Sequence, residues 1–309
     1  MEPLTLTKIQ NLMNFSKGDP SIKIALIDGP VYIDHPAFES SIIKTVNESE
    51  LVKCRYADSI ACIHGTCIAG ILCAKRGVSA PAICPDCTLL LRPIFSDNIQ
   101  IKNSHNQIDV NKGNQGNHIY FPSSNSEELA EAIVEVVEQG AKIINLSLGL
   151  SKSSLTLYPK LQEAYDYARK NGVIIVAAAG NLGNIGGLSL IENEWIIPVA
   201  ACDQYGRFDS TSNIGPSIGS RGLMAPGIHV KSTFPGVGGR YKQMSGTSFA
   251  APFVTGAIAL LWSIFPNASA AQMVHSIRNR FMSRNRERSI IPPLLNAETP
   301  YRILQKTIK

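Results

Sequence analysis

The sequence lacks the features of a membrane-spanning or exported protein. None of its apolar runs reaches the roughly 18 residues that a transmembrane helix needs. Its N-terminus contains neither the basic start nor the apolar stretch of a secretory signal. The seven cysteines are an odd number, which in an unexported chain suggests reduced thiols. We therefore expect a cytoplasmic protein that does not enter a membrane.

Excess charge of one sign is also scarce, except at the C-terminal end. The 309-residue chain has a net charge of +5, and residues 278–309 hold eight Lys or Arg and two acids, which is +6 and leaves −1 for the remainder. No interleaved aromatic residues suggest base stacking in this basic region. We expect a solvated terminal helix and tail there, not a nucleic-acid interface.

What the sequence does contain is an alternation of apolar strands and helices. The pattern predicts an α/β fold, a three-layer sandwich with a mainly parallel central sheet and helices on both faces. The predicted strands are 22–28, 88–95, 141–149, 173–181 and 195–202. The predicted helices are 64–74, 126–140 and 158–172, with a further buried helix after Ser248 whose first turn holds Pro252.

No linker or internal repeat divides the chain. We expect an N-terminal extension (1–21), one main domain (22–280) and a basic C-terminal tail (281–309). The segment 98–125 is polar and rich in Asn and Gln, and it is too long for an ordinary connection. It predicts a mobile loop or a functional lid.

Three side chains with complementary chemistry stand next to these elements. Asp28 closes the first strand, His64 is predicted to open a helix at "HGT", and Ser248 opens another at "GTS". A serine nucleophile needs an imidazole to accept its proton and a carboxylate to orient that imidazole. Taken singly, each residue is more often a helix cap or a turn residue. The three together favour nucleophilic catalysis.

The motifs around these residues resemble those of subtilisin-like serine proteases, in order and spacing. The matching stretches are "LIDGPVYIDHP", "HGTCIAG", "INLSLG", "VAAAGN", "LMAPG" and "SGTSFAAP", between about residues 22 and 279. The chain order Asp, His, Ser is that of subtilisin. Within the family, "DGPV", "LRPIFSD" and "SGTSFAAP" are most similar to the proteases that mature cyanobactin-type ribosomal peptides.

The resemblance implies a serine endopeptidase that processes a ribosomally made precursor peptide through an acyl-enzyme. Ser248 would be the nucleophile, His64 the general base and then acid, and Asp28 the group that orients His64. Asn181 would donate a hydrogen bond to the oxyanion, together with the backbone N–H of Ser248. The implied partner is a peptide or protein substrate; the sequence predicts no oligomeric state.

The same resemblance implies the substrate-binding residues. Ser147, Leu148 and Gly149 would pair with an extended substrate through main-chain hydrogen bonds. Ala178, Ala179 and Gly180 would line the pocket for the residue before the cut. The insertion at 98–125 would cover or extend the cleft on the side that holds the residues preceding the cut.

We expect no metal and no cofactor. The segment 74–87 is short and poor in the oxygen ligands that calcium needs. "CPDC" (84–87) has no second CxxC or histidine pair at metal-ligand spacing, so a turn with two thiols is favoured over a zinc site. Cys67, one turn after His64, is expected to be a buried small residue, although a thiol there could make activity sensitive to oxidation.

Three alternatives to a precursor-processing hydrolase remain: a macrocyclising transpeptidase, a non-catalytic homologue that binds a leader peptide, and a general scavenging protease. Macrocyclising relatives carry a helical insertion between the aspartate and the histidine. Asp28 and His64 are 36 residues apart, which leaves no room for one, so we expect water to resolve the acyl-enzyme. Only 27 residues precede Asp28, so we also expect folding without a cleaved pro-segment, and restricted access or weak activity that protects the host.

Overall fold

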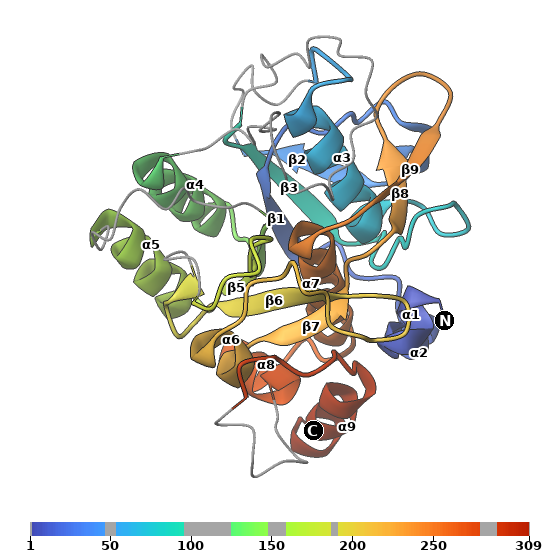
Figure 1. Ribbon diagram of the computed structural model, residues 1–309. Coiled ribbons are helices and arrows are strands. Elements are labelled where there is room, and N and C mark those ends of the chain that lie inside the picture. The colour runs from blue at the N-terminus through green and yellow to red at the C-terminus, as the bar shows by residue number, and fades with distance from the viewer. Residues whose placement is uncertain are drawn as a thin grey trace.

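A computed structural model represents the protein, and it describes residues 2–46, 54–95, 125–147, 159–186, 191–278 and 289–308. Within these ranges the expected α/β fold is confirmed: a parallel sheet lies between two layers of helices (Figure 1). The expected insertion at 98–125 lies outside the described residues, except for Asn125, whose side chain caps a helix.

The central sheet has the strand order β2-β3-β1-β4-β5-β6-β7, and every neighbouring pair is parallel. The strands are β1 Lys23–Asp28, β2 Ile42–Thr45, β3 Thr88–Pro93, β4 Ile143–Leu146, β5 Ile174–Ala178, β6 Ile197–Cys202 and β7 Leu223–Pro226. From β1 the chain crosses to the edge strand β2, inserts β3 between β2 and β1, and then adds β4 on the other side of β1. Ligands of open parallel sheets bind beyond the carboxyl ends of the strands at such a reversal.

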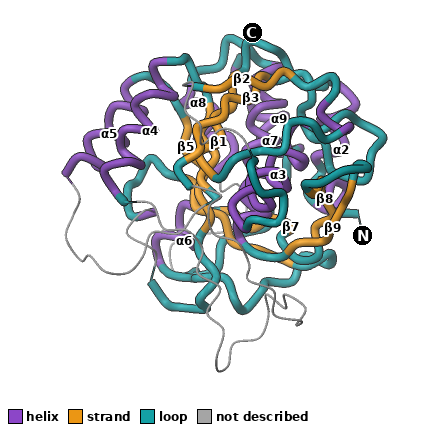
Figure 2. Tube along the Cα trace, turned by 90° about the horizontal axis from the view of Figure 1, so that it is seen from above, coloured by secondary structure: helices purple, strands orange, loops and turns teal. Residues whose placement is uncertain are grey.

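Each face of the sheet has its own hydrophobic core. Ile24 and Leu26 of β1 belong to one core and Ala25 and Ile27 to the other, as the two-residue repeat of a strand dictates. Figure 2, seen from above, shows α4 and α5 on one side of the strands and α3 and α7 on the other. The first core also includes α2, α8 and α9, and the second includes α6. The bounds are α2 Ile9–Phe15, α3 Ile60–Cys73, α4 Ser126–Glu138, α5 Pro159–Lys170, α6 Pro216–Arg221, α7 Thr247–Ile264, α8 Ala270–Arg278 and α9 Glu298–Thr307.

An antiparallel hairpin, β8 (Val230–Phe234) and β9 (Arg240–Met244), braces α3. The hydroxyls of Ser232 and Thr233 donate hydrogen bonds to the carbonyls of Cys67 and Thr66, at 2.6 and 2.7 Å. A Cβ on Gly70 would lie 2.1 Å from the Thr233 hydroxyl, so glycine is needed for this close approach.

Two expectations about the helices are wrong: the start of α3 and the position of Pro252 in α7. Helix α3 begins at Ile60, because the Ser59 side chain accepts a hydrogen bond from the N–H of Cys62 and caps the helix there. His64 therefore lies in the second turn of α3 and does not open it. In α7, Pro252 is the sixth residue and lies inside the helix, beyond the first turn where we expected it.

The two ends of the chain pack on the main body. Within the expected N-terminal extension, α1 (Pro3–Leu6) precedes α2, whose Ile9, Leu12 and Met13 are buried. The expected terminal helix is present as α9, and it packs on α8 and α2 through its buried residues Pro300 and Leu304. Phe15 of α2 stacks on Tyr301 of α9, with ring centroids 5.4 Å apart.

Helix α7 has the length and composition of a membrane span, but 83% of its 18-residue window is buried inside the fold. It packs against β4, β5, β6 and β7. Its apolar surface on all sides is explained by its position in the core of one face.

Candidate active site

The carboxylate of Asp28 and the imidazole of His64 meet at the carboxyl end of β1. The Nδ1 atom of His64 lies 2.7 Å from Oδ1 of Asp28, and the same oxygen accepts a hydrogen bond from the N–H of Gly29 at 2.7 Å. Asp28 is fully buried, whereas the His64 side chain is 13% exposed. The carboxylate of Asp28 accepts a hydrogen bond from Nδ1–H of His64. This contact fixes the tautomer in which Nε2 carries no proton and can accept one.

Two glycines allow α3 to approach β1 this closely. A Cβ on Gly29 would lie 2.2 Å from the carbonyl oxygen of Ala61, and one on Gly65 would lie 2.5 Å from the carbonyl oxygen of Gly29. Any side chain at either position would separate the helix from the strand. The short distance between Asp28 and His64 therefore depends on backbone contact between their chain neighbours.

The pKa of His64 is raised above its ordinary value. Burial is the largest single influence and opposes the charged imidazolium, but the charge of Asp28 and its hydrogen bond together outweigh burial. The ring of His64 also packs against the ring of Phe249, with centroids 5.5 Å apart. Phe249, the residue that follows Ser248, is buried, so this ring contact places His64 against the first turn of α7.

Ser248 is the second residue of α7, where free backbone N–H groups point out of the helix. Its neighbour Gly246 caps the helix with a φ of 139°, a conformation that favours glycine. The hydroxyl of Ser248 donates its one proton to the carbonyl of Ser147 at 3.0 Å, so in this arrangement it does not donate to His64. A rotation of the Ser248 side chain is needed to join the two, as is common in unliganded active sites.

The side-chain amide of Asn181 lies over the start of α7. Its Oδ1 accepts a hydrogen bond from the backbone N–H of Thr247 at 2.8 Å. Because an N–H can donate only to the oxygen of an amide, this contact fixes the amide orientation and leaves Nδ2 to donate. A Cβ on Gly246 would lie 3.2 Å from Nδ2, so the donor is close to the backbone just before Ser248.

Asn213, which no sequence motif indicates, holds the loop that carries Asn181. Its Oδ1 accepts from the N–H groups of Leu182 and Asn184 at 3.1 and 3.2 Å, and its Nδ2 donates to the carbonyl of Ala179 at 3.0 Å. Its own N–H donates to the carbonyl of Gly180. Asn213 is buried and lies about 30 residues along the chain from these partners, so no local pattern could have revealed it.

Comparison with known proteins is consistent with this geometry. A profile of the subtilase family matches residues 19–290. The chain belongs to the subtilase family. It is 33% identical, over 80% of its length, to a thermophilic serine proteinase from Bacillus sp. (strain AK1), and it spans 54% of that protein. It is 29% identical to subtilisin DY from Bacillus licheniformis, over 85% of this chain and 83% of the relative.

Solved structures show the same fold. The prenylagaramide maturation protease PagA is 25% identical, with a TM-score of 0.76, and the match covers 96% of this chain and 98% of PagA. The patellamide maturation protease PatA is 28% identical, with a TM-score of 0.70 and coverage of 94% and 98%. The PatG macrocyclase domain, at 19% identity and a TM-score of 0.77, shares the fold.

The structure describes part of the expected substrate-binding set of this subtilase. Ser147 follows β4 and is buried, whereas Leu148 and Gly149 lie outside the described residues. Ala178 and Ala179 are buried at the end of β5, and the N–H of Gly180 donates to the hydroxyl of Thr247 at 3.1 Å. These three residues can therefore form a wall of backbone and methyl groups.

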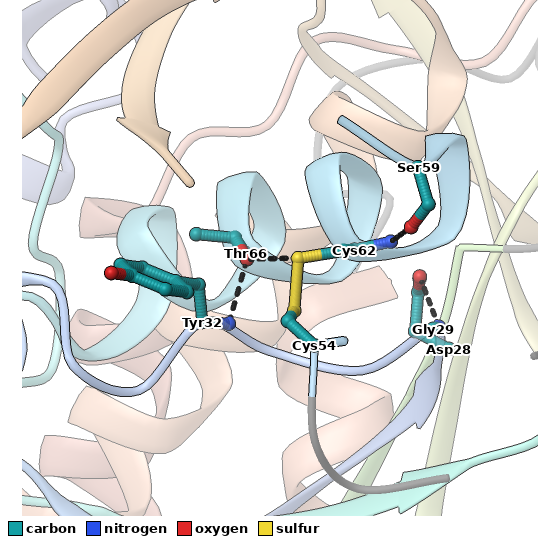
Figure 3. The surroundings of a disulfide bond; sticks show 7 residues. All are labelled: Asp28, Gly29, Tyr32, Cys54, Ser59, Cys62 and Thr66. Atoms are coloured by element: carbon teal, nitrogen blue, oxygen red, sulfur yellow. Dashed lines mark hydrogen bonds between the residues drawn. A yellow bond between two sulfur atoms is a disulfide. The ribbon is translucent and has the colours of Figure 1, made fainter. Parts of the chain in front are cut away.

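A disulfide lies beside the histidine of this subtilase. Cys54, in the segment before α3, is bonded to Cys62, two residues before His64 on α3, as Figure 3 shows. The Cys62 sulfur also lies 3.9 Å from the Thr66 hydroxyl, which accepts from the N–H of Tyr32. In this structure the pair is oxidised, whereas we expected reduced thiols throughout.

The other five cysteines of the subtilase are buried free thiols. Burial raises the pKa of Cys67 to about 12, so this thiol is protonated and packs as a small apolar side chain, as expected. In "CPDC", a hydrogen bond between the two thiols raises the pKa of Cys84 and lowers that of Cys87. Their backbones form a turn, with Cys87 N–H donating to Cys84 carbonyl at 3.1 Å.

Proposed function

We propose that this subtilase is a serine endopeptidase that hydrolyses peptide bonds through an acyl-enzyme. The observation that carries the proposal is the 2.7 Å contact between Asp28 and His64, made beside α7, the helix whose second residue is Ser248. The ring contact between His64 and Phe249 supports a short path from imidazole to hydroxyl. An imidazole oriented by Asp28 next to the helix that carries Ser248 favours catalysis over a non-catalytic binding role.

The chemistry follows from these groups. Ser248 Oγ attacks the substrate carbonyl while its proton passes to Nε2 of His64, and Asp28 stabilises the imidazolium that forms. Nδ2 of Asn181 and the N–H of Ser248 donate to the oxyanion. His64 then gives the proton to the leaving amine, and the C–N bond breaks. A water molecule, deprotonated by His64, attacks the acyl-enzyme. The ester bond to Ser248 Oγ then breaks, and His64 returns the proton to Oγ, which releases the acid and regenerates the enzyme.

We further propose that the substrate is a ribosomally made precursor peptide. The likeness to PagA and PatA, both described as maturation proteases, supports this substrate class. The alternative activity is macrocyclisation, because the PatG macrocyclase domain has the same fold. Between Asp28 and α3 the described residues contain the short helix Pro36–Phe38 and β2, and no longer helix that could cover an acyl-enzyme. This favours hydrolysis.

An activity-based probe tests the reaction class. A fluorophosphonate should label the wild type at Ser248, and labelling should be lost in Ser248→Ala and reduced by about 10⁶-fold in rate in His64→Ala. An unlabelled wild type would overturn the proposal. Mass spectrometry of the products from precursor-like peptides tests the outcome: linear acids are expected, whereas a cyclic main product would establish the macrocyclase alternative.

The cytoplasmic location expected from the sequence is part of the same proposal. Disulfides persist mainly in oxidising compartments, so the proposal predicts that Cys54 and Cys62 are thiols in the cell and pair only after exposure to an oxidant. Rapid alkylation of intact cells, followed by mass spectrometry, measures this. A disulfide already present before lysis would contradict the cytoplasmic location and leave the proposed reaction untouched.

A further inference from the structure

A proline inside α7 leaves the carbonyl of Ser248 without its helical partner. In an α-helix the carbonyl of a residue accepts from the N–H four positions later. Four positions after Ser248 stands Pro252, which has no N–H, and both residues lie within α7. A buried carbonyl without a donor is costly, so another group must supply the hydrogen bond.

The side chain of Ser147 supplies it. The hydroxyl of Ser147 donates to the carbonyl of Ser248 at 2.9 Å, and the hydroxyl of Ser248 donates to the carbonyl of Ser147 at 3.0 Å. The two serines are therefore joined by reciprocal bonds. One belongs to the end of β4, beside the expected substrate-pairing residues, and the other is the proposed nucleophile.

The direction of the hydrogen bonds behind Ser147 follows from chemistry. A carbonyl can only accept, so the Ser147 hydroxyl must donate its one proton to the carbonyl of Ser248. The oxygen of the same hydroxyl then accepts from Nδ2 of Asn145, at 2.8 Å. That contact orients the amide of Asn145 so that its Oδ1 accepts from the hydroxyl of Thr255, at 2.8 Å. Thr255 must therefore be a donor.

All the side chains in this relay are buried. Asn145 and Thr255 are 0% exposed and Ser147 is 2% exposed. Asn145 lies on β4, and Thr255 lies on α7 seven residues after Ser248, two helical turns along the same face. The relay thus links β4 to α7 at two levels, in a part of the core where polar groups are stabilised only by their partners.

We propose that Thr255, Asn145 and the Ser147 side chain are positioning residues that fix the main chain of Ser248 against the end of β4. This inference rests on the proposed function. The Ser248 carbonyl and N–H are on the same backbone as Oγ, so loss of the relay lets the first turn of α7 shift. The nucleophile, the oxyanion donor and the strand end then lose their relative alignment, on which the rate of acylation depends.

The test compares two threonine-to-valine changes of the same shape. Thr255→Val removes the first donor of the relay. Thr88→Val is the matched control, because Thr88 is also buried and also donates one hydrogen bond, to the carbonyl of Pro20, far from the site at the other end of β3. Thr255→Ser, which keeps the donor, is the conservative rescue, and Ser147→Ala breaks the relay nearer the nucleophile.

Thr255→Val should lower kcat for a peptide substrate, and the rate of fluorophosphonate labelling, by about ten- to a hundredfold. KM should be unchanged. The pH at which kcat/KM reaches half of its maximum on the acidic side should also be unchanged, because the substitution does not touch His64. Thr88→Val should retain wild-type kcat with a similar loss of thermal stability. Thr255→Ser should recover most of the rate, and Ser147→Ala should lose at least as much as Thr255→Val.

Equal kcat values for folded Thr255→Val and Thr88→Val would overturn the inference while the wild type stays active, which leaves the proposed function standing. If Thr255→Val does not fold, Ser147→Ala decides the same question: wild-type kcat in that variant would overturn the inference. A wild type that neither hydrolyses peptides nor reacts with the probe would overturn the inference and the proposed function together.

Discussion

The two helical layers on the sheet are built differently. On one face, α3 and α7 are buried on nearly every side: 11 of 14 residues of α3 and 15 of 18 residues of α7 are buried. On the other face, α4 and α5 are amphipathic, with 6 of 13 and 4 of 12 residues buried. Candidate catalytic residues lie on α3 and α7, and none of them lies on α4 or α5.

The difference indicates what a catalytic layer requires. Gly29 and Gly65 let backbones approach until a Cβ would clash, Gly70 makes room for the side chain of Thr233, and buried polar side chains join α3 and α7 to their neighbours. Such contacts hold the candidate catalytic side chains in place, because neighbouring groups on every side restrict each rotamer. The layer of α4 and α5, called here the outer layer, buries one apolar face of each helix. This stabilises the fold without orienting the site. Substitutions can separate the two roles.

The largest effect after loss of the nucleophile or base is expected for Asp28→Asn. The amide keeps the shape but no longer fixes the tautomer of His64, and kcat should fall by about 10⁴-fold. In the wild type, kcat/KM should rise with pH through the raised pKa of His64, since the base must be unprotonated. Without the Asp28 charge, burial lowers the pKa of His64, so the rise of kcat/KM with pH (the acidic limb) should shift to lower pH.

A pH series of kcat/KM for wild type and Asp28→Asn measures both effects. The control is Asp166→Asn, on the exposed face of α5, which should retain the wild-type rate and limb. A limb that stays in place in Asp28→Asn would contradict the assignment of the raised pKa to the contact between Asp28 and His64.

Asn181→Ala should have the next largest effect. It removes the Nδ2 donor beside Ser248 and should lower kcat on the order of 10²- to 10³-fold with little change in KM. The matched control is Asn184→Ala in the same loop, because the N–H of Asn184 that bonds Asn213 is retained. If the two variants lose the same activity, the loop matters for its fold alone and Asn181 is no oxyanion donor.

The same contrast explains what could be predicted from the sequence. Asp28, His64, Ser248 and Asn181 stand in local motifs, and the strands and amphipathic helices follow hydrophobic periodicity, so all of these are predictable. Asn213, Asn145 and Thr255 act through partners far away in the chain. No local pattern distinguishes them from ordinary polar residues, although a lone Asn inside the apolar strand "AKIINLSLG" is a signal that a buried partner must exist.

The misplaced boundaries have local physical causes. The sequence predicts the start of α3 at His64 because the apolar and sulfur-bearing residues before it give no helical period, whereas the Ser59 cap sets the true start. It predicts Pro252 in a first turn because proline is favoured there. Pro252 is tolerated deeper in α7 because Ser147 donates the hydrogen bond that Pro252 cannot. The disulfide joins two cysteines that are eight residues apart, and this spacing alone does not distinguish a bonded pair from two free thiols.

In the outer layer, Ile133→Val should affect stability alone. Ile133 of α4 is fully buried in the core of that face, and loss of one methylene should lower the free energy of unfolding by about 0.5–1.5 kcal/mol. Chemical denaturation measures this, and kcat of the folded fraction should equal that of the wild type. A lower kcat at full folding would show that the two layers are coupled through the sheet.

The smallest effect is expected at the exposed ion pair between the two outer helices. Lys160 of α5 lies 3.1 Å from Glu127 of α4, and both side chains are about two-thirds exposed. Solvent and salt screen such a pair, so Glu127→Gln should change the free energy of unfolding by less than about 1 kcal/mol, and by less still at high salt. The carboxylate also lies in the first turn of α4, where it interacts favourably with the helix dipole. Lys160→Met separates the two contributions, because it removes the ion pair and keeps the carboxylate: an equal loss in both variants assigns the effect to the pair, whereas a loss confined to Glu127→Gln assigns it to the helix dipole.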